Sequence, residues 1–408
     1  MKCKAIVSLA AFSLAVIVVG IGLQQLGTMN LTRCQRASVA KSVIPRVEKH
    51  QHFASSYSAA REKFLKAAQE SGGKIESFQN QNVGPNGEPL FIDVAFVGAD
   101  DAQRILVISS GTHGVEGFAG SGLQTRLLKE GIGSRLPTGI SLLLIHAINP
   151  YGMAHLRRFT EDNVDLNRNF RVHAEPLPRN PPYEKLADAI APQSLSFWPE
   201  VSSWSRLLWF RLTAGKAALQ AAVSGGQYSH PNGLFYGGTF DTWSNKTVRS
   251  IVRRYLSHTN QVVVIDVHTG LGEFGSAEVI LNVPEDSIVY HRALNIWGPT
   301  LVKTTATNKS VSTHLDASLK LAIPGMLPEA EVTAVSLEFG TISLMEVFKS
   351  LRAENWLHHH GGASHPKAFE LKMCLLRAFY PDSVEWEASV WNQGKQVIER
   401  ALLKLSSS

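Results

Sequence analysis

Short apolar runs alternate with amphipathic segments along most of the chain. The runs are rich in Val, Ile and Leu, as expected for strands that are buried on both faces of a sheet. This alternation predicts an α/β fold in which helices cover a mainly parallel sheet. The clearest predicted strands are residues 104–109, 140–147, 261–267, 277–283 and 334–339.

The segments between these runs have the periodicity of helices with one apolar face. The predicted helices are residues 61–70, 117–130, 202–222, 246–258, 343–357, 366–378 and 384–405. The stretch 171–199 is rich in proline and is predicted to be an irregular excursion over the surface.

At the N-terminus, Lys2 and Lys4 precede an apolar run over residues 5–23. Its length is close to the roughly 20 residues that a helix needs to cross a bilayer, and no small-x-small cleavage site follows it. We therefore expect an uncleaved signal-anchor in residues 1–27, with a cleaved signal peptide as the alternative. A polar connector over 28–60 and one large domain over 61–408 follow. The basic residues before the apolar run favour a cytoplasmic N-terminus, whereas those after it favour the opposite orientation. Of the two orientations, we favour the one with an extracytoplasmic domain over the one with the domain on the cytoplasmic side.

Composition changes this picture little. Hydrophobic residues make up 44% of the chain and charged residues 18%, which describes a globular protein with a large core. The formal net charge is +6, but the basic residues are spread along the whole chain without a nucleic-acid motif. We therefore expect no nucleic-acid partner. The oligomeric state is not predicted.

Three of the predicted strands lead directly into polar residues. His113 follows the strand at 104–109, His268 follows the strand at 261–267, and Glu338 lies near the end of the last strand. In open α/β sheets, ligands bind at the carboxyl ends of the strands. The sequence therefore predicts an active-site cleft at this edge.

The strongest local signal is a glycine-rich turn that carries His113 and Glu116, three residues apart. The two side chains can point at the same space if the turn begins a helix, and the glycines permit the tight backbone path. Catalytic zinc sites commonly use two His, one Glu and a water. Taken alone, such a pair is more often a capping His and a surface Glu.

The third ligand must come from elsewhere, and His268 stands at a strand end followed by glycines. A single histidine at such a position can also be an ordinary core residue. His146, His155 and His173 lack a strand-end partner, and the cluster at 358–360 is typical of a solvated helix end.

Glu338 lies in an otherwise apolar strand. A buried carboxylate is costly unless it is paired, bound to metal or functional. Near zinc it can take a proton from an activated water. The structural alternative for this residue is a salt bridge at the strand end.

A polar segment at 163–170 supplies a candidate substrate site. Asn167 and Arg168 form a plausible carboxylate clamp, because a guanidinium binds a carboxylate through two parallel hydrogen bonds. Asp165 can accept the free ring N–H of a metal-bound histidine and so fix its tautomer. The alternative is a turn with surface arginines.

In their order along the chain, these motifs resemble the zinc carboxypeptidase superfamily, which includes carboxypeptidase A and the aspartoacylase and succinylglutamate desuccinylase branch. The shared motifs are His-x-x-Glu at 113–116, Asn-Pro-x-Gly at 149–152, Asp-x-Asn-Arg-Asn at 165–169, a strand-end His and a later Glu. Several strings are closer still to a bacterial subfamily of these proteins with poorly defined substrates.

The resemblance implies a fold with a central mixed sheet of about eight strands between helices. It implies one Zn²⁺ held by His113, Glu116 and His268, with Glu338 as general base and acid. It also places Asn167 and Arg168 at the substrate carboxylate. Arg158 matches the arginine that polarises the scissile carbonyl, although its neighbour Arg157 is an alternative.

The implied activity is hydrolysis of an amide bond next to a free carboxylate, as in a carboxypeptidase acting on peptides. An N-acyl amino acid deacylase on the same scaffold is the first alternative, and a membrane-tethered metal-binding pseudoenzyme is the second. An insertion at about 171–235 is expected to roof the cleft, and Tyr228 and Tyr236 are candidates for a substrate-capping tyrosine. A serine hydrolase is disfavoured because the chain lacks a Gly-x-Ser-x-Gly motif.

Overall fold

The computed structural model describes residues 51–307 and 310–407, and its centre is an eight-stranded mixed sheet. The strand order is β1-β2-β4-β3-β5-β8-β6-β7. The central strands β4, β3, β5 and β8 pair in parallel, as does β6 with β7, whereas β1, β2 and the β6–β8 pair are antiparallel. The strands are β1 Lys74–Val83, β2 Pro89–Val97, β3 Arg104–Ser110, β4 Ile140–His146, β5 Gln261–Thr269, β6 Ala277–Leu281, β7 Val302–Thr304 and β8 Glu331–Phe339. The predicted mostly parallel α/β fold is confirmed.

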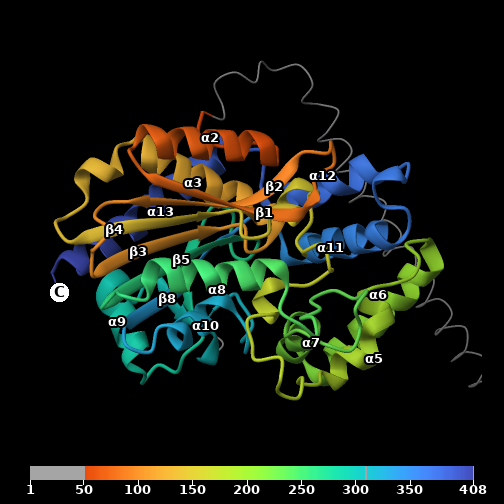
Figure 1. Cartoon of the computed structure of the whole chain (residues 1–408). Coiled ribbons are helices and arrows are strands. Elements are labelled where there is room, and N and C mark those ends of the chain that lie inside the picture. Colours follow the sequence, from red (N-terminus) through yellow and green to blue (C-terminus); the bar gives the residue numbers. More distant parts are fainter. Residues whose placement is uncertain (1–50, 308–309, 408) are drawn as a thin grey trace, which may run out of the picture.

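Helices cover both faces of this sheet (Figure 1). On one face lie α2, α3, α9 and α13, and on the other lie α8 and α10. Helices α5, α6, α7 and α11 gather at one end of the molecule. The helices are α2 Tyr57–Glu70, α3 Gly117–Lys129, α4 Pro150–Ala154, α5 Pro181–Ile190, α6 Phe197–Ala214, α7 Lys216–Ser224, α8 Trp243–Leu256, α9 Ile288–Trp297, α10 Leu319–Met326, α11 Leu344–His359, α12 Ala368–Phe379 and α13 Val384–Ser406. Short 3₁₀ turns are η1 Gly114–Glu116, η2 Ile132–Arg135, η3 Leu166–Arg168, η4 Thr305–Thr307 and η5 Gly362–Ser364.

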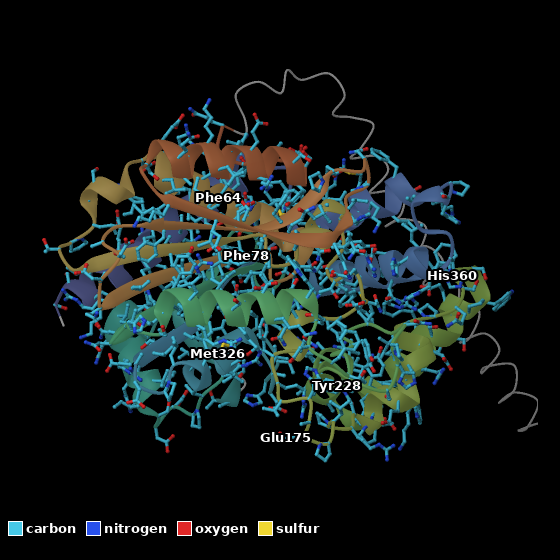
Figure 2. The ribbon with its side chains drawn as sticks, viewed as in Figure 1. Phe64, Phe78, Glu175, Tyr228, Met326 and His360 are labelled. Carbon is cyan, nitrogen blue, oxygen red and sulfur yellow. The ribbon has the colours of Figure 1, made fainter. Side chains whose placement is uncertain are left out.

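The two-faced core follows from the alternation of side chains along each strand. In β3, Leu106 and Ile108 join the core under α2 and α3, while Ile105 and Val107 join the core under α8. Phe64 of α2 is fully buried between its helix and the sheet (Figure 2). Burial on both faces is why these strands appear in the sequence as continuous apolar runs.

Three of the predicted segments have a different structure. The helix predicted over 202–222 is two helices, because Gly215 adopts φ 94° and separates α6 from α7. The prediction that 171–199 is irregular was wrong where α5 forms, with Asn180 accepting a hydrogen bond from the Tyr183 N–H at its start. The predicted helix at 61–70 begins earlier, at Tyr57, capped by Ser56.

Within residues 51–307 and 310–407, no helix combines the length and apolar character needed to span a membrane. The apolar run at 5–23, which carries the signal-anchor prediction, lies outside the described residues.

Candidate metal centre

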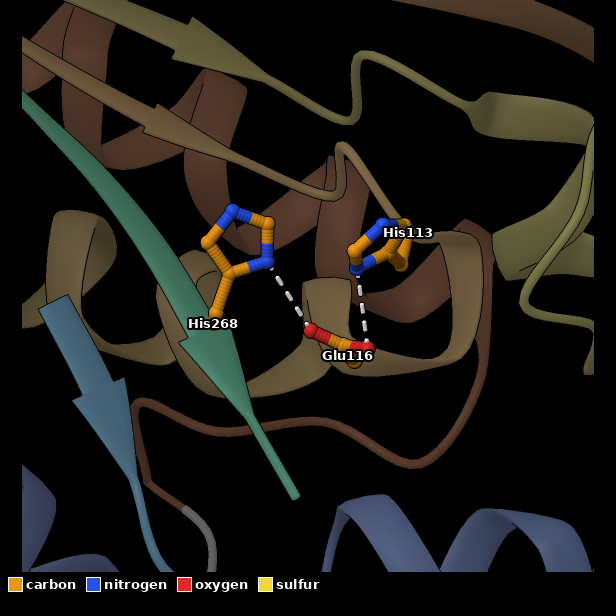
Figure 3. A group of neighbouring side chains, drawn as sticks. All are labelled: His113, Glu116 and His268. Atoms are coloured by element: carbon orange, nitrogen blue, oxygen red, sulfur yellow. Dashed lines mark hydrogen bonds and ion pairs between the residues drawn. The ribbon is translucent and has the colours of Figure 1, made fainter. Parts of the chain in front are cut away.

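His113, Glu116 and His268 converge at the carboxyl ends of β3 and β5 (Figure 3). Each offers one ligand atom, and these atoms lie within 4.8 Å of one another, so the three residues can hold a metal ion. We call these three residues the metal group. The two oxygens of Glu116 face different histidines, with Oε1 3.0 Å from His113 Nδ1 and Oε2 3.0 Å from His268 Nδ1. All three side chains are buried.

A close backbone approach shapes the turn that carries two of these residues. Gly114 begins η1, where a Cβ atom would lie 2.1 Å from the carbonyl carbon of Gly152. Main-chain hydrogen bonds from the N–H groups of Gly114 and Val115 reach the carbonyls of Arg158 and Arg157. Because only glycine permits this contact, the turn and the segment at 157–158 are held as one unit.

A carboxylate lies behind each histidine. His113 Nε2 is 3.1 Å from Asp165 Oδ1, and His268 Nε2 is 2.6 Å from Asp266 Oδ2. A ring that donates from Nε2 to a carboxylate leaves the Nδ1 lone pair free, and this is the tautomer that binds metal. His113 Nδ1 is buried and forms no hydrogen bond, and its 3.0 Å contact with Glu116 Oε1 is an ion pair without hydrogen-bond geometry, as expected for two atoms that could share a metal ion.

Asp266 was missed as a site residue by the sequence analysis. It lies two residues before His268 on β5, so both side chains point to the same face of the sheet. Ser109 and Thr112 donate to its Oδ1 atom at 2.7 and 2.8 Å, which fixes the carboxylate. The spacing Asp-x-His within a strand is the signal that could have identified it.

The charged side chains at this site shift one another's pKa values. Burial alone would raise the pKa of Glu116, but His113 and Arg158 hold it below its ordinary value. Burial alone would lower the pKa of His268, but Asp266 and Glu116 raise it to about 10. A metal ion that binds His268 must therefore displace a proton from this ring.

Glu338 lies beside the metal group because β5 and β8 pair in parallel with His268 opposite Glu338. Its Oε1 atom accepts a hydrogen bond of 3.0 Å from the Leu271 N–H. Burial and the nearby charge of Glu116 raise the pKa of Glu338 to about 7. A carboxyl group with such a pKa can accept and return a proton near neutral pH.

The two adjacent arginines have different surroundings. Arg158 contacts Glu116 through Nη1 and lies 3.1 Å from Asp165 Oδ2 through Nε. Arg157 instead lies 2.9 Å from Glu354 on α11, in a buried cluster that Lys372 of α12 joins. Arg158 is therefore the arginine at the metal group, and Arg157 has a structural position.

Asn167 and Arg168 both lie in η3 and are buried. Asn167 Nδ2 is 3.3 Å from His268 Nε2, and Asn167 Oδ1 accepts from the Leu319 N–H. Arg168 lies 3.4 Å from Asp165 Oδ1, and its Nη2 donates to the Ser224 carbonyl of α7. Arg168 thus connects the polar segment at 163–170 to α7.

The metal group opens into a cavity of about 630 Å³. His113, Glu116, His268, Glu338, Arg158, Asn167 and Arg168 all line it. Asp165 supports the site from behind. Lys320 of α10, which the sequence analysis did not single out, also lines the cavity, and burial lowers its pKa to about 8.

Other candidates from the sequence lie elsewhere. His146 is fully buried in the core, where its Nε2 is 2.9 Å from Ser121 Oγ and its ring stacks on Phe64. Tyr228 donates to the Arg168 carbonyl at 2.6 Å, and the Tyr236 carbonyl accepts from the Asp165 N–H. Neither tyrosine is among the residues that line the cavity.

Several solved structures are similar to this one. They include carboxypeptidase A from Helicoverpa armigera, with 12% identity, a TM-score of 0.45, and coverage of 93% of this chain and 80% of that chain. Bovine thrombin-activatable fibrinolysis inhibitor has 11% identity, a TM-score of 0.40, and coverage of 85% and 98%. Succinylglutamate desuccinylase from Chromobacterium violaceum has 16% identity, a TM-score of 0.35, and coverage of 74% and 75%. Similarity at this level is not evidence of a shared activity.

No curated protein matches the chain in sequence. The model of a family described as "Protein of unknown function (DUF2817)" matches residues 53–393. Because this match spans most of the 408 residues, the chain belongs to the DUF2817 family.

Proposed function

We propose that this protein is a zinc-dependent hydrolase that cleaves an amide bond next to a free carboxylate. The observation that carries the proposal is the meeting of three metal-ligand side chains with the buried Glu338 in one cavity. Two His and one Glu form a common ligand set of catalytic zinc, with one position left for water. A purely structural zinc site would have four protein ligands.

Each residue then has a defined part. When bound, Zn²⁺ would act as a Lewis acid toward a water molecule and the substrate carbonyl. Glu338 takes the proton of that water and passes it to the leaving amine, for which a pKa near 7 is suited. Arg158, beside Glu116 at the cavity wall, stabilises the negative charge that develops on the carbonyl oxygen.

The substrate carboxylate is assigned to Arg168 and Asn167. Both line the cavity, and Arg168 is a permanent cation near the metal group. Asp165 and Asp266 orient the two histidines and do not touch the substrate.

A deacylase acting on N-acyl amino acids is the second candidate. Helices α6 and α7 of the insertion contribute to the lining of the cavity. A narrow roof formed by these helices would favour a small molecule over a long peptide, whereas an open funnel would favour a carboxypeptidase.

The test is hydrolysis of blocked dipeptides and N-acyl amino acids by the purified zinc-loaded protein, with a chelator as control. We expect amine release that the chelator abolishes and that added zinc restores. Glu338→Gln is expected to retain zinc and lose at least a thousandfold in kcat, because the proton acceptor is removed. Metal content is measured by elemental analysis.

Glu331→Gln is the matched control, because Glu331 lies on the same strand but is exposed and outside the cavity. It should keep full turnover. Normal turnover in Glu338→Gln would remove Glu338 from its role. A zinc-loaded wild type that releases no amine from any substrate would favour the pseudoenzyme.

A further inference from the structure

Beyond the metal group, the cavity is lined mainly by apolar side chains from three helices. We call this part the apolar slot. It consists of Trp204, Leu207 and Leu208 of α6, Leu219 and Val223 of α7, and Leu344, Val347, Phe348 and Leu351 of α11. The roles assigned above to the metal ligands and Glu338 do not use it.

The slot is longer than one amino-acid side chain. On α6 the row from Trp204 to Leu208 spans four residue steps, or about 6 Å at the helical rise per residue. On α11 the row from Leu344 to Leu351 spans seven steps, or about 10 Å. The rows adjoin, because the rings of Trp204 and Phe348 meet edge to face with centroids 5.9 Å apart.

Several polar side chains in this wall are already paired with other protein groups, whereas Arg211 and Lys216, which also line the cavity, are exposed. Ser224 Oγ lies 2.9 Å from Thr313 Oγ1, and Gln220 donates to the Val311 carbonyl at 3.2 Å. Ser205 donates to the Val201 carbonyl at 2.7 Å. An extended peptide in the slot would leave its backbone N–H and C=O groups without partners, which is costly. An aliphatic chain has no such groups.

The slot also reaches the surface through an apolar rim. Leu208, Leu344 and Met345 line the cavity, yet 48%, 49% and 47% of their respective surfaces are exposed. Large apolar side chains that are both half exposed and continuous with a cavity are typical of a binding site for an apolar group.

We propose that the apolar slot binds the aliphatic chain of a long-chain N-acyl amino acid whose amide lies at the metal group. The inference rests on the proposed amide hydrolase function and names its substrate class. Arg168 lies near the slot, because it donates to the carbonyl of Ser224, next to Val223 on α7. The carboxylate and the aliphatic chain of one molecule can therefore be held within the same cavity.

Binding to the full-length, chelator-treated protein tests this without catalysis. Calorimetric titrations use N-acetyl-, N-hexanoyl- and N-dodecanoyl-alanine at concentrations below micelle formation. Each methylene buried in the slot should strengthen binding about fourfold, so the dodecanoyl compound should bind at least a hundredfold more tightly than the acetyl compound. Equal affinities for the three compounds would overturn the proposal.

Two matched variants test where the aliphatic chain of the ligand binds. Leu208→Glu places a charge in the slot, whereas Leu212→Glu makes the same change one turn later at a residue that is 72% exposed and outside the cavity. We expect the first to weaken dodecanoyl binding at least tenfold and the second to leave it unchanged. Equal losses, or none, would show that the chain binds elsewhere.

Val223→Trp provides an independent test by filling the slot, with Ala221→Trp, an exposed site on the same helix, as its control. The chain-length dependence should vanish only in the first. If the zinc-loaded protein cleaves none of these amides while chain-length-dependent binding persists, the hydrolase proposal is wrong and the proposal that the slot binds an aliphatic chain is supported. If it cleaves them all with equal kcat/KM and equal affinity, the hydrolase proposal is supported and the slot proposal is wrong.

Discussion

At the scale of single residues, the partner of a histidine decides its chemistry. His113 and His268 each have a carboxylate on one ring nitrogen and Glu116 near the other. His146 is equally buried but meets Ser121 and the ring of Phe64. The sequence could propose the first two because each stands at the end of a predicted strand. Asp266 was missed, although its position two residues before His268 in the same strand puts both side chains on one face of the sheet.

Asp266→Asn is expected to weaken zinc binding by about 10- to 100-fold, because the orientation and basicity of His268 are lost. Competition with a chromophoric chelator measures the affinity. Asp316→Asn is the control, since Asp316 forms an exposed pair with His314. An unchanged zinc affinity in Asp266→Asn would contradict the role of this carboxylate.

His146 should make the fold sensitive to acid. Burial lowers its pKa to about 4, below the ordinary value of 6.5, so the folded state holds the ring neutral. Above pH 6.5 the ring is neutral in both the folded and the unfolded protein, so its full contribution to stability is present. As the pH falls toward 4, the unfolded chain takes up a proton that the folded protein does not, and the free energy of unfolding decreases by about 3 kcal/mol in total. Denaturant unfolding at pH 7 and 4.5 should show a smaller loss in His146→Leu than in the wild type. Equal losses in the two proteins would exclude His146 as the cause.

At the scale of elements, strand register brings Glu338 to the site. The sequence located β5 and β8 but not their register, which pairs His268 with Glu338. Strands β1 and β2 were not predicted. For the edge strand β1 the reason is that its exposed positions carry polar side chains, which blur the apolar signal. The break at Gly215, which separates α6 from α7, was not predicted because the apolar pattern continues across it.

Gly114→Ala tests the close contact that shapes η1. The added Cβ would meet the Gly152 backbone at 2.1 Å, so the turn with Glu116 must move. We expect a loss of about 3 kcal/mol or more in unfolding free energy and weaker zinc binding. Gly325→Ala, within α10 and with open space around its Cβ, should instead be neutral or stabilise by up to about 1 kcal/mol. Comparable losses in the two variants would contradict the steric argument.

At the scale of the whole molecule, the candidate site joins segments that are far apart in sequence. The three candidate metal ligands come from the turn after β3 and from β5, and Glu338 comes from β8. The order of the motifs along the chain was enough to predict that these residues lie together, because parallel strands bring their carboxyl ends to one edge of the sheet. The substrate side was less predictable, since the slot depends on how α6, α7 and α11 pack.

Zinc should therefore stabilise the entire fold and not only the local turn. At a free zinc concentration of about 1,000 times Kd, the gain is about 4 kcal/mol, provided that the unfolded chain binds little zinc. Thermal unfolding with zinc and with chelator should differ by several degrees. The shift should disappear in His268→Ala, and a shift of equal size in that variant would exclude His268 from the ligand set.

The adjacent arginines 157 and 158 couple two parts of the protein. One guanidinium is anchored to Glu354 on α11, and the next lies against Glu116 at the metal group. A displacement of α11, for example by an aliphatic chain entering between α6 and α11, would act on the same short stretch of backbone that carries Arg158. Under the proposed function, a ligand in the apolar slot would therefore bear on the position of Arg158 beside Glu116.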